Sequence, residues 1–212
     1  MLKIDPKPLE NEVTFGVNCI FLIYEWLGFQ PTYYAVEDWL VYEDRFDDIR
    51  TFVTESHCFF PIQFSTEVFD RGNHSYFRAM YDFDVHIGWP NFSKNASKLI
   101  WSGGTVSYVC LQLAFYMGFS EVYLIGFDHN YTKPSDVKIK GNAWTSQRND
   151  PNHFHPDYFG KGKRWHDPRV DRMAKAYKRA KQAFESDGRR IYNATVGGKL
   201  EVFERVDYQS LF

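Results

Sequence analysis

The sequence predicts an α/β domain with a mostly parallel sheet. Three observations predict it: short β-prone runs alternate with helix-like apolar segments, the connections between these segments are short, and glycine or proline stands at many of the boundaries. Parallel neighbours need crossover helices, so the alternation favours parallel pairing. The 212 residues, of which 44% are hydrophobic, predict one globular domain over residues 1–212.

The N-terminal part is predicted to form a strand, a helix and a second strand. Val13–Asn18 is β-prone, and Cys19–Leu27 carries the apolar content of a helix. Gly28 follows as a residue typical of helix C-caps. Tyr33–Glu37 then predicts a second strand that ends at Asp38.

The central part repeats the pattern. The turn Ser102–Gly104 precedes a helix predicted over Thr105–Met117, which Gly118 ends. Glu121–Gly126 then predicts a buried strand that runs into Asp128.

The C-terminal part is predicted to form a helix followed by a strand. Asp167 supplies an N-cap and Pro168 occupies the first helical position, while Gly188 ends the helix. Arg190–Asn193 predicts the strand, and Asn193–Gly198 is either a ligand-facing turn or a simple bend. One apolar stripe at helical spacing runs along the helix: Val170, Met173, Ala174, Tyr177, Ala180 and Phe184.

Three long segments show no regular pattern: Asp44–Pro61, Val68–Lys98 and Tyr131–Arg164. The third predicts an active-site loop or lid over residues 131–166, since long loops in compact domains are usually functional. The segment Gly160–Arg190 is rich in basic residues. It indicates an anionic ligand, peripheral membrane association through lipid headgroups, or a solvated helix face.

Composition excludes several classes of protein. Lys and Arg number 25 and Asp and Glu 27, a net charge of −2, which argues against nucleic-acid binding. No apolar run approaches the roughly 20 residues that cross a bilayer, and the first residues lack a signal-peptide layout, so we expect a cytoplasmic, soluble protein. Cys19, Cys58 and Cys110 lack metal-site spacing and predict buried thiols.

Several candidate ligand-binding residues follow predicted strands or precede a helix. Ligands of α/β sheets bind outside the carboxyl ends of the strands, where Asn18, Asp38 and Asp128 are expected. The Ser102–Gly104 turn can cradle an anion through unpaired backbone N–H groups, although two glycines equally suit a purely conformational turn. Asp128 can hold a metal or a ribose hydroxyl, or can cap a neighbouring loop.

The loop after Asn152 concentrates histidine, aromatic and acidic residues. His153 is a candidate general base or acid, because imidazole exchanges protons near neutral pH. Tyr131, Tyr158 and Lys161 can donate to phosphate oxygens. Ordinary loop packing is the alternative for all of them, and the spacing matches no standard zinc motif, so no metal site is predicted.

Taken together, these motifs resemble one known family in order and spacing. They are similar to the Rossmann-like family of bacterial CMP-sialic-acid-dependent sialyltransferases, motility accessory factors and 6-hydroxymethylpterin diphosphokinase-like proteins. The resemblance covers the chain from about Glu12 onward and implies a Rossmann-like three-layer fold. It is carried by Phe15–Asn18, Pro31–Asp38, Ser102–Gly104, Val122–Asp128, Asn152–Phe154 and Asn193–Gly198.

The resemblance also implies roles for particular residues. His153 matches the catalytic histidine of the sialyltransferase branch. Tyr131 matches the tyrosine that helps to neutralise the leaving phosphate, with one extra residue between Asp128 and Tyr131 in this sequence. No glycine-rich loop of the family's first strand unit precedes Leu9–Val13, so that unit is expected to be missing. The matching nucleotide-contacting positions are Asn18, Ser102, Gly103 and Asp128, beside which Asp38, Gly104 and Tyr158 are further candidates.

The leading functional hypothesis is transfer of a nonulosonic sugar from a CMP-activated donor to a glycan or protein hydroxyl, with no cofactor required. Two alternatives stay open. One is an ATP-dependent 6-hydroxymethylpterin diphosphokinase-like enzyme, in which Asp38 or Asp128 holds Mg²⁺. The other is a non-catalytic, degenerate member that binds a glycan or a partner.

Overall fold

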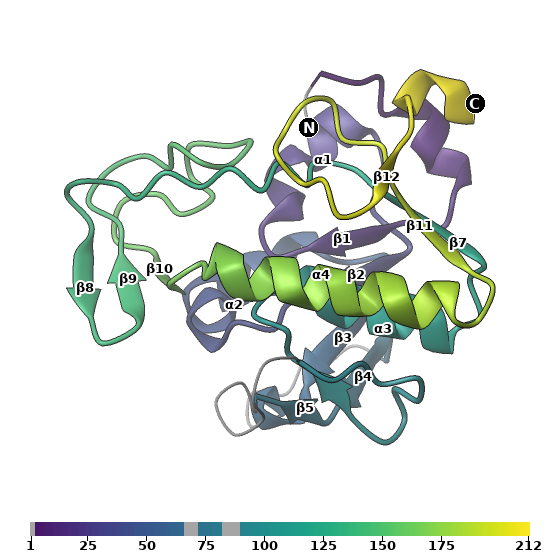
Figure 1. The fold of residues 1–212 in the computed structure, drawn as a ribbon. Coiled ribbons are helices and arrows are strands. Elements are labelled where there is room, and N and C mark those ends of the chain that lie inside the picture. The colour runs from purple at the N-terminus through teal and green to yellow at the C-terminus, as the bar shows by residue number, and fades with distance from the viewer. Residues whose placement is uncertain (1–2, 66–71, 82–89) are drawn as a thin grey trace. The chain divides into compact units, whose positions relative to one another are not determined.

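The structure, a computed structural model, describes residues 3–65, 72–81 and 90–212 (Figure 1). Helices and several sheets are mixed along the chain, which confirms the α/β class. The chain divides into two compact units, each described here by itself. Unit 1 comprises Met1–Ile4, Phe77–Asn130 and Pro168–Phe212, and unit 2 comprises Asp5–Tyr76 and Tyr131–Asp167.

Unit 2 contains a four-stranded sheet in the order β1-β2-β3-β4. Strand β1 pairs parallel with β2, and β2 pairs parallel with β3, as the alternating pattern predicts. The strands are β1 (Phe15–Val17), β2 (Tyr33–Ala35), β3 (His57–Pro61) and β4 (His74–Phe77).

The helix predicted over Cys19–Leu27 starts as a 3₁₀ turn. This turn, η2 (Ile20–Ile23), continues directly into α1 (Tyr24–Leu27). Gly28 ends α1 with a φ of 79°, the left-handed conformation that glycine adopts most readily. Other 3₁₀ turns are η1 (Lys7–Asn11) and η3 (Ile62–Phe64) in unit 2 and η4 (Tyr208–Leu211) in unit 1.

The prediction of irregular chain from Asp44 to Pro61 is wrong, because this stretch holds most of helix α2 (Trp39–Phe52) and strand β3. The Asp38 side chain caps α2 by accepting the N–H of Leu40, so β2 ends earlier than predicted. A charged residue interrupts the apolar stripe of the helix, which weakens its sequence signal. The buried positions are Val41, Tyr42, Arg45 and Ile49.

Aromatic rings fill the core beneath α2. Tyr42 stacks on Phe64 with ring centroids 4.4 Å apart and packs edge-on against Phe60 at 5.5 Å. All three side chains are buried. Part of the high aromatic content of the sequence is therefore explained by core packing.

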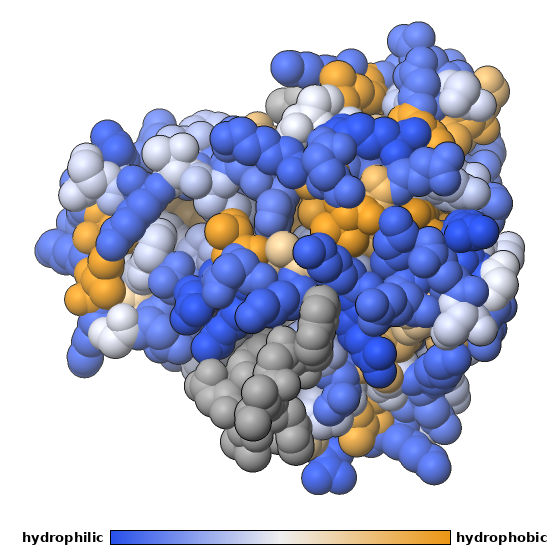
Figure 2. All heavy atoms as spheres, in the orientation of Figure 1, coloured by the Kyte–Doolittle hydropathy of each residue, from blue (hydrophilic) through white to orange (hydrophobic). Residues whose placement is uncertain are grey.

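The segment predicted as irregular, Tyr131–Arg164, contains regular structure as well. Strands β8 (Lys138–Lys140) and β9 (Ala143–Thr145) form a hairpin, and β10 (Arg164–His166) pairs antiparallel with β9 (Figure 1). The strand pattern is short and its buried side chains are few, so it carries little periodic signal. Figure 2 shows a small hydrophobic patch among hydrophilic residues at this hairpin. Ile139, between two exposed lysines of β8, is 48% exposed.

Unit 1 contains a parallel sheet in the order β12-β11-β7 and two long helices. Strand β11 (Arg190–Asn193) has the predicted bounds, and helix α3 (Val106–Tyr116) lies within the predicted one. Gly118, which was predicted to end this helix, follows its C-cap residue Met117 and has a positive φ. The remaining elements are β5 (Ala79–Met80), β6 (Ile100–Trp101), β7 (Glu121–Leu124), β12 (Glu204–Arg205) and α4 (Val170–Glu185).

The apolar stripe of α4 forms much of the core of unit 1, as predicted. Met173, Tyr177, Ala180 and Phe184 are buried, whereas Val170 is 38% exposed. They pack against buried side chains of α3, β7 and β11 and the chain after β11: Tyr108, Leu111, Phe115, Leu124, Ile191, Leu200 and Phe203.

The predicted start of α4 is wrong. The N-cap is Arg169, which makes no side-chain capping hydrogen bond, so neither Asp167 nor Pro168 holds its predicted position. The backbone N–H of Asp167 instead donates to the carbonyl of Asn142 within unit 2. This bond continues the pairing of β10 with β9 and delays the helix.

Strand β7 is less buried than predicted. Its pairing in the β12-β11-β7 sheet leaves it at an edge, and Glu121 and Tyr123 are exposed while Leu124 is buried. Alternate residues therefore face solvent, as on a half-covered strand.

Other predictions concern isolated positions. Cys19, Cys58 and Cys110 are free thiols, the first two buried as predicted and the third partly exposed. The predicted irregular stretch Val68–Lys98 includes residues 68–71 and 82–89, which lie outside the described residues, and elsewhere contains β4 and β5. Across 3–65, 72–81 and 90–212, no helix is both long and apolar enough to cross a membrane.

Candidate functional site

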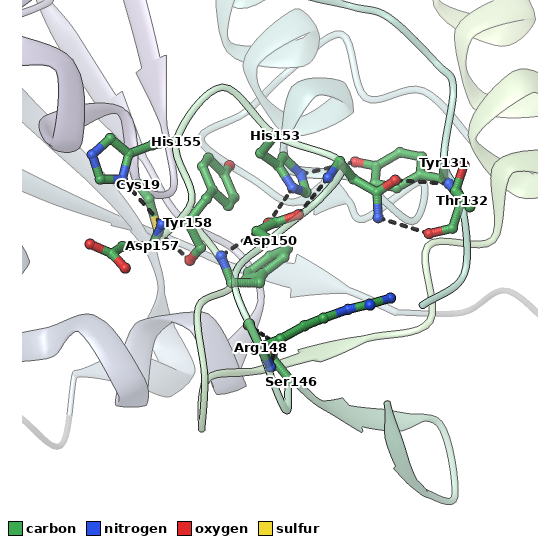
Figure 3. Close-up of polar contacts among 12 residues, drawn as sticks. Cys19, Tyr131, Thr132, Ser146, Arg148, Asp150, His153, His155, Asp157 and Tyr158 are labelled. Carbon is green, nitrogen blue, oxygen red and sulfur yellow. Dashed lines mark hydrogen bonds and ion pairs between the residues drawn. The ribbon is translucent and has the colours of Figure 1, made fainter. Parts of the chain in front are cut away.

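A histidine–carboxylate pair lies in the loop between β9 and β10 of unit 2. His153 Nδ1 is 2.7 Å from Asp150 Oδ2, and Figure 3 shows the two side chains pointing toward one another. The imidazole is 16% exposed and the carboxylate 3%. A buried carboxylate therefore fixes a histidine that still reaches the surface.

Hydrogen bonds keep Asp150 ionised. Burial disfavours the charged form, but bonds from His153 and from the backbone N–H groups of Asn152 and Phe159 outweigh burial and lower the pKa of Asp150. An ionised carboxylate can only accept, so His153 must donate through Nδ1. In the neutral imidazole, Nε2 is then the basic nitrogen.

Aromatic rings surround His153. Tyr158 stacks on the imidazole with centroids 4.0 Å apart and planes 6° apart, and Phe159 meets it edge-on at 5.0 Å. The Tyr131 hydroxyl lies 3.4 Å from His153 Nε2. This contact is long for a hydrogen bond, so a substrate hydroxyl can compete for Nε2.

A pair of hydrogen bonds brings Tyr131 to His153. The Asn152 side chain accepts the N–H of Thr132 at 2.8 Å and donates to its carbonyl at 2.9 Å. Figure 3 shows Thr132 with the dashed lines of its hydrogen bonds. We call this pair of bonds the Asn152–Thr132 clasp.

Asn18 joins the same cluster from the end of β1. Its φ is 48°, and its backbone carbonyl accepts the Tyr34 hydroxyl at 2.6 Å. Burial raises the pKa of Tyr158, and a side-chain hydrogen bond with Asn18 opposes the rise. Four predicted site residues therefore converge in unit 2: Asn18, Tyr131, His153 and Tyr158.

Asp38 has a structural role in the same unit. Besides capping α2, its carboxylate accepts the backbone N–H of His166 at 3.0 Å and lies 2.8 Å from His166 Nδ1. The hydrogen bond to Asp38 raises the pKa of His166. These bonds occupy both carboxylate oxygens of the residue predicted to contact a ligand.

The Ser102–Gly104 turn lies at the N-terminus of α3 in unit 1. Thr105 caps the helix by accepting the N–H of Ser107 at 3.4 Å. Gly103 has a φ of 60°, and a Cβ there would lie 2.1 Å from the Tyr108 ring. Packing alone thus requires glycine at this position, which favours the conformational interpretation of the turn.

Asp128 also lies in unit 1, where it is exposed. Its carbonyl accepts the N–H of Lys199 at 2.8 Å, and Gly198 packs so closely that a Cβ would lie 2.9 Å from the Asp128 main chain. The Asn193 side chain donates to the Leu200 carbonyl and accepts the N–H of Thr195, whose hydroxyl donates to the Leu124 carbonyl, so Asn193–Gly198 is a structured bend.

His129 and Tyr177, which the sequence did not suggest as site residues, connect the loop after β7 with α3. The centroid of the Tyr177 ring lies 6.1 Å from that of the His129 ring. Burial raises the pKa of Tyr177, and side-chain hydrogen bonds with Ser107 and Thr105 oppose the rise. Burial lowers the pKa of His129. Tyr177 belongs to the apolar stripe of α4, where sequence periodicity identifies it only as a core residue.

No cluster of three or more His, Cys, Asp or Glu side chains suited to a metal occurs in the described ranges. Comparisons with known protein families, curated proteins and solved structures found no match to this chain. The family resemblance therefore rests on the sequence motifs and remains a prediction.

Asp150 should make stability depend on pH in the acid range. Its folded pKa lies below the unfolded value of about 3.8, so its contribution is present above pH 4 and is lost as pH falls through the folded pKa. We expect Asp150→Asn to flatten this part of the profile. Urea unfolding at several pH values between 2 and 6 measures the free energy of unfolding. The same dependence of this free energy on pH in Asp150→Asn and in the wild type would count against an ionised Asp150.

Proposed function

We propose that this chain transfers a nonulosonic-type sugar from a CMP-activated donor to a hydroxyl acceptor, with His153 as the general base. The observation that carries the proposal is the convergence of His153 and Tyr131 beside the buried Asp150. These are the two residues that the resemblance to sialyltransferases marks as catalytic. Asn18 and Tyr158 lie in the same cluster.

The arrangement fits the proton transfer that such a reaction requires. His153 Nε2 takes the proton of the acceptor hydroxyl, and the acceptor oxygen forms a bond to the anomeric carbon of the sugar. The bond from that carbon to the CMP phosphate oxygen breaks, and CMP leaves with the electron pair. Asp150 stabilises the imidazolium, while the Tyr131 hydroxyl donates to the departing phosphate.

The proposal extends to fold type and location. Parallel pairing of β1-β2-β3 and of β12-β11-β7 supports a Rossmann-like topology. Free thiols at Cys19 and Cys58 support a reducing, cytoplasmic location. Glycans or proteins with accessible hydroxyls are the proposed acceptors.

Thermal unfolding with nucleotides tests the proposal. A ligand that binds only the folded state at a hundred times its Kd adds about 2.7 kcal/mol of stability. We expect CMP to raise the melting temperature in the presence of EDTA. A shift that needs ATP with Mg²⁺ would instead support the pterin diphosphokinase alternative, and no shift with any nucleotide would contradict both.

A further inference from the structure

A buried arginine on α2 contacts the loop that contains the candidate site. Arg45 is 8% exposed, which is unusual for a charged side chain unless it is paired. Its Nη1 lies 2.9 Å from Asp48, and its Nη2 donates to the carbonyls of Asp157 and, at 3.1 Å, Tyr158. One guanidinium thus ties two consecutive peptide groups to the helix.

The Tyr158 carbonyl has a second buried donor. The Cys19 thiol lies 3.5 Å from it, and burial raises the pKa of Cys19 to about 12, which keeps the sulfur protonated as a donor. The Tyr158 backbone is therefore held from both η2's N-cap residue and α2. Tyr158 is 5% exposed, and its ring stacks on His153.

Stacking matters most when His153 is charged. A cation that lies over the face of an aromatic ring, within about 6 Å of its centroid, is attracted by the negative charge of that face. A general base becomes an imidazolium when it takes the acceptor proton. Tyr158 stabilises that state in this way while the face of its ring stays against the imidazole, as it does here with the centroids 4.0 Å apart.

We propose that Arg45 is a positioning residue, which holds the 157–158 backbone so that the Tyr158 ring stays stacked on His153. Its effect on turnover rests on the proposed function, but its effect on geometry does not. The guanidinium fork serves two carbonyls and Asp48 at once, whereas a lysine ammonium is a single point donor. Arg45→Lys should therefore restore only part of the geometry.

NMR of the His153 ring protons reads the stacking directly, because a parallel ring at this distance moves them upfield. Tyr158→Leu gives the chemical shift of the His153 ring protons without a stacked Tyr158 ring. Tyr158→Phe keeps the aromatic ring and gives the shift with stacking retained. We expect Arg45→Gln to lose most of the shift and Arg45→Lys to lose part of it. Arg50→Gln, an exposed arginine on the same helix, is the matched control and should behave as the wild type.

Turnover supplies the second measurement. If the transferase proposal holds, Arg45→Gln should lower kcat by about ten- to a hundredfold with little change in KM, as expected for a misplaced catalytic group. Wild-type ring-proton shifts in folded Arg45→Gln would overturn the positioning role. If Arg45→Gln does not fold, wild-type shifts in folded Arg45→Lys would overturn it as well. Lost stacking in a chain that has no transferase activity would refute the transferase and keep the positioning role.

Discussion

If the chain catalyses the proposed sugar transfer, replacing His153 with alanine is expected to lower kcat for CMP release by about 10²–10⁴-fold, the usual contribution of a general base. The Asp150 carboxylate holds the imidazole through Nδ1, which leaves Nε2 as the basic nitrogen. Alanine has no imidazole, so the substitution removes this base. CMP binding should persist, because proton abstraction is a separate step from nucleotide recognition. Release of CMP from a CMP-activated nonulosonic acid, assayed with sugar and peptide acceptors, measures the effect.

The neighbouring histidine provides the control. His155 lies two residues further along and accepts the N–H of Asp157 instead of contacting Asp150. His155→Ala should keep turnover close to that of the wild type. Equal losses in the two variants would point to general damage of the loop, and wild-type turnover in His153→Ala would refute the general base.

The largest expected effect on stability is at Phe184, at the centre of the core of unit 1. Its side chain has no solvent exposure, and its ring lies 5.2 Å from Phe115 and 6.1 Å from Phe92. Phe184→Ala removes these contacts and leaves a cavity, which costs about 3–5 kcal/mol of unfolding free energy. Urea unfolding followed by circular dichroism measures the change.

An exposed phenylalanine in the same unit controls for composition. Phe212 is 53% exposed, so Phe212→Ala should change the free energy of unfolding by no more than about 0.5 kcal/mol. A Phe184→Ala loss as small as this would contradict the packing described for α3 and α4.

Local signals explain which elements the sequence could predict. Strand β11 and helix α3 are bounded by glycines and turn residues, and the stripe of α4 has helical spacing, so their places follow from short-range chemistry. Helix α2 was not predicted because one buried position of its stripe is Arg45. Two of the groups that Arg45 contacts, the carbonyls of Asp157 and Tyr158, lie more than a hundred residues away in the chain.

The sequence predicts only part of the candidate site, because contacts between residues distant in the chain complete it. Residue type and the family resemblance predict His153 and Tyr131 as site residues. Their proximity depends on the Asn152–Thr132 clasp, which joins residues 20 positions apart. Asp150 was missed, although its spacing from His153, three residues, is a local signal that could have found it. No such spacing links Tyr158 to Asn18, because tertiary packing brings them together.

The Asn152–Thr132 clasp has an entropic consequence. Closing a free loop of about 20 residues costs roughly 2.7 kcal/mol from the length-dependent part of chain entropy alone. The clasp joins the two ends of the loop immediately beside Tyr131 and His153, so this entropy is lost during folding. Under the proposed function, a substrate would therefore meet the two side chains already in place and would not have to provide the free energy that orders them.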